Sequence, residues 1–401
     1  MSKQRAFVRY TKAGEVVPGS LILTNGSYPN GPALWEEVPA DLCCSTTPVE
    51  EIYTMVLRFN IDPEGLGNFI GGDPYVLASW NTFFDLPVYG AEFTSLTFEN
   101  PTLYETIVTL VGGHDIYVKD GLFYDISILV SVDDSGAVTT IGDASFGYCS
   151  SLKTVRFANC TRTIYTEDVD YGSFGSSYNL YSVDMPKLYD LGEGTFYDCE
   201  EMTDIILDFN NITYLAPYTF YYNYYVENWS FPNVIYVGDD CFEDCGGALS
   251  FNFPSLITAA GYAFQNCTDT TIFNMPSLIN IGKFTFVNCT NILSFSFPSA
   301  VNVNDFGFFF CPNTISFNLP LVTNVGSHAF SNCTSSTTFN LNSIVWVGQE
   351  DCSLDDSVFN GIIGNTITLT VPTAIMTCDS GFPDADIVGL QSNNTVTVIT
   401  V

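Results

Sequence analysis

The stretch Leu278-Ile-Asn-Ile-Gly-Lys-Phe-Thr-Phe-Val-Asn-Cys-Thr-Asn-Ile292 recurs, with substitutions, every 22 residues along the centre of this 401-residue chain. Three residue types mark the period: Phe242, Phe264, Phe286, Phe308 and Phe330; Cys245, Cys267, Cys289, Cys311 and Cys333; Pro232, Pro254, Pro276, Pro298 and Pro320. A fixed period of this length indicates one small structural unit stacked on copies of itself.

The repeat extends beyond its most regular part. Anchored on the phenylalanine, it runs from Phe146 through Phe174, Phe196 and Phe220 to Phe330, with Cys352 at the tenth position. The first spacings are 28, 22 and 24 residues. The longest predicts a six-residue insertion within 160–171, and insertions in solenoids lie in surface loops. Acidic residues cluster there and form our candidate binding loop: Glu167, Asp168 and Asp170.

Each unit predicts a short strand, a turn and a buried side chain. The alternation around Phe295 predicts a strand with phenylalanine facing inward, ended by Pro298, which cannot donate to a ladder. We expect Gly282 and Gly326 to supply a turn with positive φ. One strand per unit and a period of about 20–29 residues are typical of a leucine-rich-repeat solenoid.

The periodic cysteines predict a column of buried, free thiols. Equivalent positions in neighbouring coils stack about 4.8 Å apart, so identical residues lie above one another. Ser177, Asn223 and Asp355 replace cysteine at three positions of the column. Small polar replacements fit a hydrogen-bonding position better than a disulfide. The chain has 13 cysteines but no Cys-x-x-Cys pair, and only His114 and His328, so we expect no zinc site.

The predicted fold class is mainly β: a leucine-rich-repeat solenoid of about ten 22-residue coils, with a small N-terminal α+β domain and a C-terminal β cap. The expected domains are an N-terminal anchor module at 1–50, the α+β domain at 51–135, the solenoid at 136–360 and the cap at 361–401. In the first two domains, residues 5–10, 21–24, 51–59, 93–98 and 106–111 are predicted as strands and 75–86 as a helix. The turn at Asp62-Pro63-Glu64-Gly65 is expected to break a strand.

Charge is distributed unevenly along the chain. The net charge is −33, which disfavours nucleic acid and anionic membranes as partners. Four of the 11 basic residues lie within the first twelve positions: Lys3, Arg5, Arg9 and Lys12. This basic tip either aids solubility or docks on an acidic partner. No apolar run is long enough to cross a membrane, and no apolar segment follows the first residues, so neither membrane insertion nor a secretory signal peptide is predicted.

The residue types needed for catalysis are scarce, and we expect a non-enzymatic protein without cofactor or metal. His328 occupies a variable repeat position, and His114 follows a Gly-Gly turn. Acidic pairs occur at 133–134, at 239–244 and at 350–356; they are interpreted as solvated turn acids, with calcium binding as the alternative. An enzymatic alternative, a glycan hydrolase, would use a carboxylate pair such as Asp239 and Asp240.

The central repeats contain almost no charge. Between residues 252 and 349 the charged residues are Asp269, Lys283 and Asp305. The exposed faces there must therefore consist of Asn, Ser, Thr and aromatic side chains. Such a surface suits glycans, a flat protein partner or packing against copies of itself, and the sequence leaves these three open.

The unit quoted above, with its pattern Leu-x-x-Ile-Gly-x-x-x-Phe-x-x-Cys, resembles the BspA-like class of leucine-rich repeats over about residues 141–355. The resemblance implies attachment, because such proteins are typically surface adhesins. The N-terminus, with Lys3-Gln-Arg-Ala-Phe-Val-Arg-Tyr10, Pro18-Gly-Ser-Leu-Ile-Leu-Thr24 and Cys43-Cys44, is similar to those of repeat proteins encoded by tailed bacteriophages of aquatic bacteria.

The two resemblances together predict a structural or binding protein of a phage particle, located in the virion as a fibre, decoration or adhesion component. Its expected partners are other virion proteins, reached through the basic tip, and a host surface protein or glycan, with homo-oligomerisation. The alternative is a bacterial cell-surface adhesin of the BspA-like type, which would be extracellular.

Overall fold

The computed structural model describes residues 21–23, 35–37, 52–86, 88, 90–102, 105–165, 172–343, 346–347, 358–362, 366–371 and 395–400. Contacts divide the chain into two compact units, Met1–Ile52 and Tyr53–Val401. In the first unit, β1 (Leu21–Leu23) pairs antiparallel with β2 (Trp35–Glu37). The strand expected at 5–10 lies outside the described residues.

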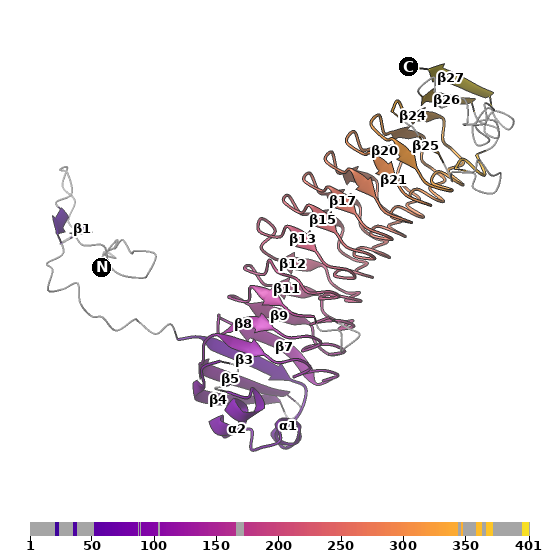
Figure 1. The fold of residues 1–401 in the computed structure, drawn as a ribbon. Coiled ribbons are helices and arrows are strands. Elements are labelled where there is room, and N and C mark those ends of the chain that lie inside the picture. Colours follow the sequence, from indigo (N-terminus) through magenta and orange to yellow (C-terminus); the bar gives the residue numbers. More distant parts are fainter. Residues whose placement is uncertain are drawn as a thin grey trace, which may run out of the picture. The chain divides into compact units, whose positions relative to one another are not determined.

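The second unit begins with a small α+β part (Figure 1). Its central strand is β3 (Thr54–Phe59), which pairs antiparallel with β5 (Glu105–Gly112) on one side and β7 (Leu129–Asp134) on the other. β4 (Phe93–Thr102) lies at the edge beside β5. The strands predicted at 51–59, 93–98 and 106–111 are therefore confirmed, with small differences at their ends.

Two short helices, α1 (Pro63–Ile70) and α2 (Leu77–Phe83), connect β3 to β4. The strand ends at Phe59, before Asp62-Pro63-Glu64-Gly65, as predicted, and this segment also begins α1, which was not predicted. Asp62 is the N-cap and its side chain accepts the N–H of Gly65 at 2.8 Å, while Pro63 occupies the first turn, where no N–H is needed. α2 is shorter than the helix predicted over 75–86.

The solenoid grows directly out of this sheet. β7 pairs antiparallel with β3 but parallel with β9 (Thr154–Phe157), and the sheet continues through β11 (Ser182–Asp184) to β12 (Asp204–Ile206). A second parallel ladder contains β6 (Ile116–Val118), β8 (Val138–Ile141) and β10 (Arg162–Thr163). The solenoid was expected to start at residue 136, but the first coil, with β6 and β7, lies before that residue.

Later coils contribute two short strands each. One ladder consists of β13 (Tyr214–Leu215), β15 (Tyr236–Val237), β17 (Thr258–Ala259), β19 (Asn280–Ile281), β21 (Asn302–Val303), β23 (Asn324–Val325) and β25 (Trp346–Val347). The other side has β14 (Asn228–Ser230), β16 (Ser250–Asn252) and β18 (Ile272–Asn274), then β20 (Ser294–Ser296), β22 (Ser316–Asn318) and β24 (Thr338–Asn340). The predicted mainly β solenoid of about ten turns of roughly 22 residues is confirmed.

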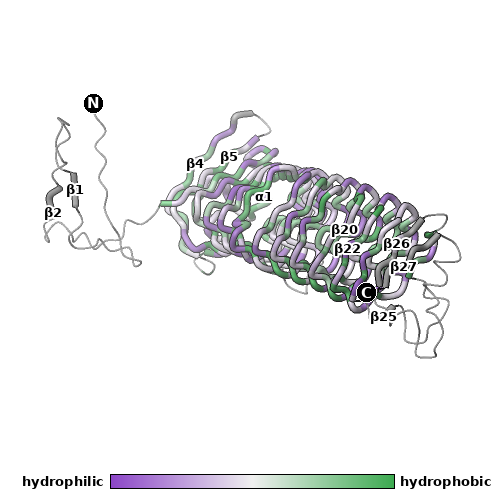
Figure 2. The backbone as a smooth tube through the Cα atoms, turned by 90° about the horizontal axis from the view of Figure 1, so that it is seen from above, coloured by the Kyte–Doolittle hydropathy of each residue, from purple (hydrophilic) through white to green (hydrophobic). Residues whose placement is uncertain are grey.

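A continuous column of phenylalanine rings forms the core. The rings of Phe123, Phe146, Phe174, Phe196, Phe220, Phe242, Phe264, Phe286, Phe308, Phe330 and Phe359 stack in order, with centroids 5.1 to 5.7 Å apart. Figure 2 shows hydrophobic and hydrophilic residues alternating around the coils. Burying one such ring in every coil gives each unit a favourable contact with both neighbours.

The column corrects the expected tenth position. Phe359, not Cys352, stacks on Phe330, and the N–H of Phe330 donates to the carbonyl of Val358 at 2.9 Å. The same offset of 29 residues (359 − 330) carries Cys333 to Ile362, which is buried, rather than to Asp355. The last coil therefore contains seven extra residues (29 − 22), a difference that the regular period does not reveal.

The repeat glycines act through close approach rather than through positive φ. Gly282 and Gly326 do not have positive φ. A Cβ at Gly282 would lie 2.5 Å from the carbonyl carbon of Ala260 in the preceding coil, and one at Gly326 would lie 2.4 Å from the nitrogen of Asp305. The left-handed positions of the same coil are Phe284 (φ 59°) and Asn288 (φ 58°). The expected role of these glycines in a positive-φ turn is wrong.

The last two strands extend the solenoid. β26 (Thr366–Val371) pairs parallel with β24, and β27 (Thr395–Thr400) pairs parallel with β26. Leu369 pairs with Phe339 in the register of this ladder. The strand expected at the end of the chain is present, and it continues the ladder in the same direction as the preceding coils.

Candidate binding surface

The predicted site residues fall outside the part of the chain that the structure describes. This applies to the basic tip, Lys3, Arg5, Arg9 and Lys12, and to the candidate binding loop, Glu167, Asp168 and Asp170. The described coils offer exposed side chains and cavities as candidate binding surfaces.

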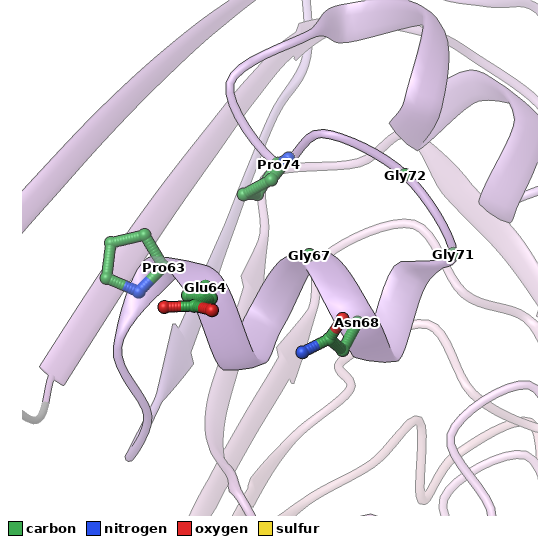
Figure 3. A pocket seen from close by; sticks show the side chains of 7 residues that line it. All are labelled: Pro63, Glu64, Gly67, Asn68, Gly71, Gly72 and Pro74. Atoms are coloured by element: carbon green, nitrogen blue, oxygen red, sulfur yellow. The ribbon is translucent and has the colours of Figure 1, made fainter.

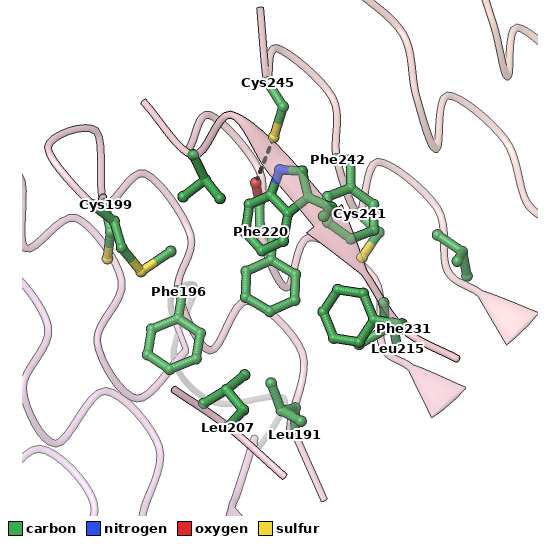
Figure 4. Packing of buried hydrophobic residues seen from close by; sticks show 14 of the residues in the cluster. Leu191, Phe196, Cys199, Leu207, Leu215, Phe220, Phe231, Cys241, Phe242 and Cys245 are labelled. Atoms are coloured by element: carbon green, nitrogen blue, oxygen red, sulfur yellow. Dashed lines mark hydrogen bonds between the residues drawn. The ribbon is translucent and has the colours of Figure 1, made fainter. Parts of the chain in front are cut away.

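The thiol column is structural. Cys245 donates to the carbonyl of Phe220 at 3.2 Å, and Cys267, Cys289, Cys311 and Cys333 make the same bond to the core phenylalanine of the coil before (Figure 4). Ser177 and Asn223 replace cysteine and keep the bond, at 2.7 and 2.8 Å. All nine described cysteines are free and buried, and burial raises the pKa of Cys149 and Cys160 to about 12. These thiols are neutral donors, as the sequence predicted.

The acidic cluster at 239–244 is used mainly to join coils. Asp239 accepts the N–H of Gly261 at 2.7 Å, and Asp244 accepts the side-chain amide of Asn266 at 2.8 Å. Glu243 accepts from Gln265 at 2.5 Å, and burial together with the neighbouring Asp240 carboxyl raises the pKa of Glu243 to about 8. Across the described ranges, no group of three or more His, Cys, Asp or Glu residues is arranged to hold a metal ion.

Four half-exposed rings form a second column, which we call the aromatic stack: Tyr262, Phe284, Phe306 and His328. Their centroids are 4.7 to 4.9 Å apart and their planes are within 9° of parallel. His328 ends the stack on Phe306, and its Nδ1 lies 3.0 Å from the hydroxyl of Ser327. The stack presents ring edges, and Phe310, 46% exposed, adds a further apolar side chain in the same coils.

Asparagine ladders occupy the strand positions. Asn302 donates to Asn280 at 2.7 Å, and Asn324 donates to Asn302 at 2.7 Å. A parallel ladder joins Asn274 to Asn252 and Asn340 to Asn318. Asn302 donates to one neighbour and accepts from the other, whereas a repeated carboxylate would stack like charges about 4.8 Å apart. This explains why the central repeats are almost free of charge, and it leaves one N–H of each amide for other partners.

A shallow cavity of about 390 Å³ lies beside α1, between that helix and the loop before α2 (Figure 3). Glu64 and Asn68, one helical turn apart, face it, and Gly67, Gly71 and Gly72 leave it open. A Cβ at Gly67 would lie 2.9 Å from Pro74, so glycine permits the close approach of helix and loop. The cavity has few convergent polar groups, which makes it a weak candidate.

The strand ladder is interrupted between β18 and β20, where the spacing is the regular 22 residues, and also between the coils of Phe196 and Phe220. β12 ends one sheet and β14 begins another, while β10 and β13 end the two ladders on the other side. The two coils remain joined at their core phenylalanines. The backbone N–H of Phe196 donates to the carbonyl of Thr219 at 2.9 Å, and that of Asp198 donates to the carbonyl of Tyr221 at 2.8 Å. The spacing of 24 residues, two more than the period, occurs in this coil.

The interruption between β12 and β14 contains a cavity of about 430 Å³, which we call the strand cleft. It is lined by Ile205, Phe209, Asn210, Asn228, Trp229, Ser230 and Pro232. The 24-residue spacing is visible in the sequence, but no site was predicted there. That spacing is the signal by which the cleft could have been found.

Comparisons with known proteins identify the repeat. The family model for the BspA type Leucine rich repeat region (6 copies) matches residues 94–170, 116–245, 165–271 and 260–373. The matches together span more than half of the chain. The chain belongs to this family. The resemblance of the repeat unit to the BspA-like class is thereby confirmed.

Solved structures are similar to this BspA-type chain at low identity. A leucine-rich repeat protein from Bacteroides ovatus ATCC 8483 is 15% identical, with a TM-score of 0.41, over 77% of this chain and 99% of that one. A leucine rich cell surface protein from Faecalibacterium prausnitzii A2-165 is 16% identical, with a TM-score of 0.33, over 77% and 86%. The pneumococcal vaccine antigen PcpA is 14% identical, with a TM-score of 0.31, over 66% and 78%. No curated protein matches the chain.

In the part of the chain that the structure describes, no helix is both long and apolar enough to span a bilayer.

Proposed function

We propose that this BspA-type repeat protein is a non-enzymatic binding protein of a bacteriophage particle. Its N-terminal unit anchors it to other virion proteins, and its solenoid presents a surface for attachment to a host protein or glycan. The observation that carries the proposal is the aromatic stack together with the asparagine ladders, which are ordered columns of ring edges and amides.

Such a surface is suited to binding because it is ordered before the partner arrives. The aromatic rings are held by stacking on their neighbours, and the amides are held by ladder hydrogen bonds, so little side-chain entropy is lost on association. Aromatic side chains supply contact area, and the remaining amide groups supply hydrogen bonds to hydroxyl or peptide groups. Of the two histidines, His328 ends the aromatic stack on Phe306, and the exposed His114 lies 3.1 Å from the carboxylate of Asp115.

The second candidate is a bacterial cell-surface adhesin. It is supported by the family match and by the F. prausnitzii protein, which is described as a cell surface protein. The binding surface would be the same, and only the anchor would differ.

Both parts of the proposal can be tested. Mass spectrometry of purified particles should detect the chain at stoichiometric amounts with the structural proteins; its absence from particles and presence on bacterial cells would favour the adhesin. For attachment, purified protein should bind host cells, and Phe310→Ser should weaken binding about tenfold. Val88→Ser, at a side chain 72% exposed, serves as the control. Equal binding by both variants would contradict the use of this surface.

A further inference from the structure

The strand cleft exposes two strand edges that have no partner strand. β12 pairs with β11 on its other side, and β14 pairs with β16 on its other side. Among the described residues, the link across the cleft is at its end, where the side-chain amide of Asn233 donates to the carbonyl of Asn210 at 2.8 Å and the rings of Phe209 and Phe231 meet at 5.3 Å. Strand pairing joins these positions from β14 to β18 and again from β20 to β24, whereas β18 and β20 belong to different sheets.

The cleft combines an apolar floor with polar edges. Ile205 and Phe209 are only partly buried although they belong to the core, and Trp229 closes the floor. The indole N–H of Trp229 is buried without an acceptor. Asn228 and Ser230 are exposed strand residues on the β14 side. Backbone edges beside an apolar floor are the features that bind an extended peptide as an added strand.

The surroundings of the cleft are acidic. Asp204 and Asp208 flank Ile205 and Phe209 in sequence, and Glu227 precedes Asn228. Asp204 and Glu227 are exposed. The chain has no Lys or Arg between Lys187 and Lys283, so no nearby basic residue in sequence offsets these charges. An extended segment that enters here should therefore be basic as well as apolar.

One segment of this chain has that composition. Residues 5–10, Arg-Ala-Phe-Val-Arg-Tyr, alternate so that Arg5, Phe7 and Arg9 would share one side of a strand and Ala6, Val8 and Tyr10 the other. We propose that the strand cleft is the docking site for residues 5–10 of a neighbouring copy, added as a strand along the open edge. This inference rests on the anchoring role proposed for the N-terminal unit and names a neighbouring copy as its partner.

The complementarity is specific in both charge and shape. Arg5 and Arg9 meet the acidic rim at Asp204 and Glu227, which favours encounter at low salt and weakens it at high salt. Main-chain hydrogen bonds to the free edge supply affinity, and an aromatic side chain occupies the apolar floor. Because the donor and the acceptor are different surfaces of one chain, the contact is head-to-tail and links successive copies.

A charge-swap experiment on the full chain tests the docking. Arg5→Glu with Arg9→Glu in one copy, and Asp204→Arg with Glu227→Arg in another, should each lower self-association at least tenfold in light scattering at low salt. Mixing the two variants should restore association. Asp115→Lys, at an exposed acid in the α+β part, is the matched control and should have no effect. Circular dichroism shows whether each variant is folded. Failure of the mixture to associate, with both variants folded, overturns the proposal.

Cross-linking locates the contact. A photoreactive benzoylphenylalanine in place of Phe7 should cross-link to peptides containing 205–209 or 228–232. In a mixture of ¹⁴N- and ¹⁵N-labelled full chains, about half of these peptide pairs should carry mixed labels. The docking proposal is overturned if all cross-linked pairs carry like labels. It is also overturned if Phe7 cross-links only to other coils or only to an added host protein. Host attachment measured in parallel separates the cases: attachment without the cross-link refutes this inference alone, and the cross-link without attachment refutes the proposed function alone.

Discussion

The thiol of Cys245 donates a hydrogen bond to the backbone carbonyl of Phe220, 3.2 Å away in the preceding coil. The bond joins the two periodic columns of the solenoid, cysteine and phenylalanine, and it repeats in the coils that follow. Its polar atoms lie inside the core, where an unsatisfied donor or acceptor would be costly. The column thus orders neighbouring coils without a covalent link.

The first prediction concerns thiol reactivity. Nine of the 13 cysteines are buried in the described part and are expected to be unreactive in the folded protein, since burial raises their pKa and thiolate is the reactive form. Titration with a thiol reagent should therefore modify at most four residues (13 − 9) before unfolding and all 13 in denaturant. Rapid labelling of Cys267 in the native protein, identified by mass spectrometry, would contradict the buried column.

The second prediction separates two effects of glycine. Gly282→Ala places a Cβ 2.5 Å from the backbone of the preceding coil and should destabilise by at least about 2 kcal/mol, because backbone cannot move aside as a side chain can. Gly121→Ala is the control: its φ is +64°, but its nearest other atom would lie at 3.9 Å, so a loss of about 1 kcal/mol is expected. Chemical unfolding of both variants measures the difference. Equal losses would mean that the coils can separate locally.

The third prediction concerns the asparagine ladder. Asn280→Asp and Asn302→Asp together should lower the free energy of unfolding by about 1 kcal/mol or more beyond the sum of the single changes. The reason is that the two carboxylates, in adjacent coils, repel each other. The extra loss should shrink in 1 M salt. In a control double-mutant cycle, Asn302→Asp is combined with Asn68→Asp, at an exposed residue of α1, and the two losses of unfolding free energy should be additive. Additivity of both cycles would show that the ladder amides do not interact.

The fourth prediction is a pH dependence. Asp134 is buried where β7 turns into β8, and burial raises its pKa from 3.8 to about 6 although three backbone N–H groups, those of Gly136, Ala137 and Val138, donate to it. The folded protein therefore holds this proton more tightly than the unfolded chain. Its contribution to stability is greatest below pH 4 and falls by about 3 kcal/mol as pH rises to 7.

Urea unfolding of the Asp134→Asn variant checks this directly. The difference in unfolding free energy between wild type and variant should change between pH 4 and pH 7, with wild type losing stability as pH rises. Asp133→Asn, at the neighbouring acid, whose side chain is 60% exposed, is the control and should show little change in that window. A wild type that gains stability relative to Asp134→Asn over the same range would show that the hydrogen bonds outweigh burial.

Much of the fold was predictable from the sequence because the repeat is local. A coil contacts mainly the coils before and after it, so 22-residue periodicity carries over directly into stacked strands and stacked phenylalanines. Ser177 and Asn223 in the cysteine column marked it as a hydrogen-bonding position, and the structure shows those bonds. The N-cap Asp62 followed by Pro63 could also have been recognised in the sequence, but this segment was interpreted only as the end of a strand.

The sequence by itself determined the coil, its period, its buried rings and its free thiols, because these depend on the unit alone. The tertiary structure decided what depends on two coils at once. The role of Gly282 follows from the backbone of the coil before it, and the tenth core position belongs to Phe359 because the coil after Phe330 is longer. The strand cleft lies where β12 and β14 are unpaired while Phe196 and Phe220 stay stacked. A one-dimensional pattern records each unit, whereas the space between units is set by how their backbones pack.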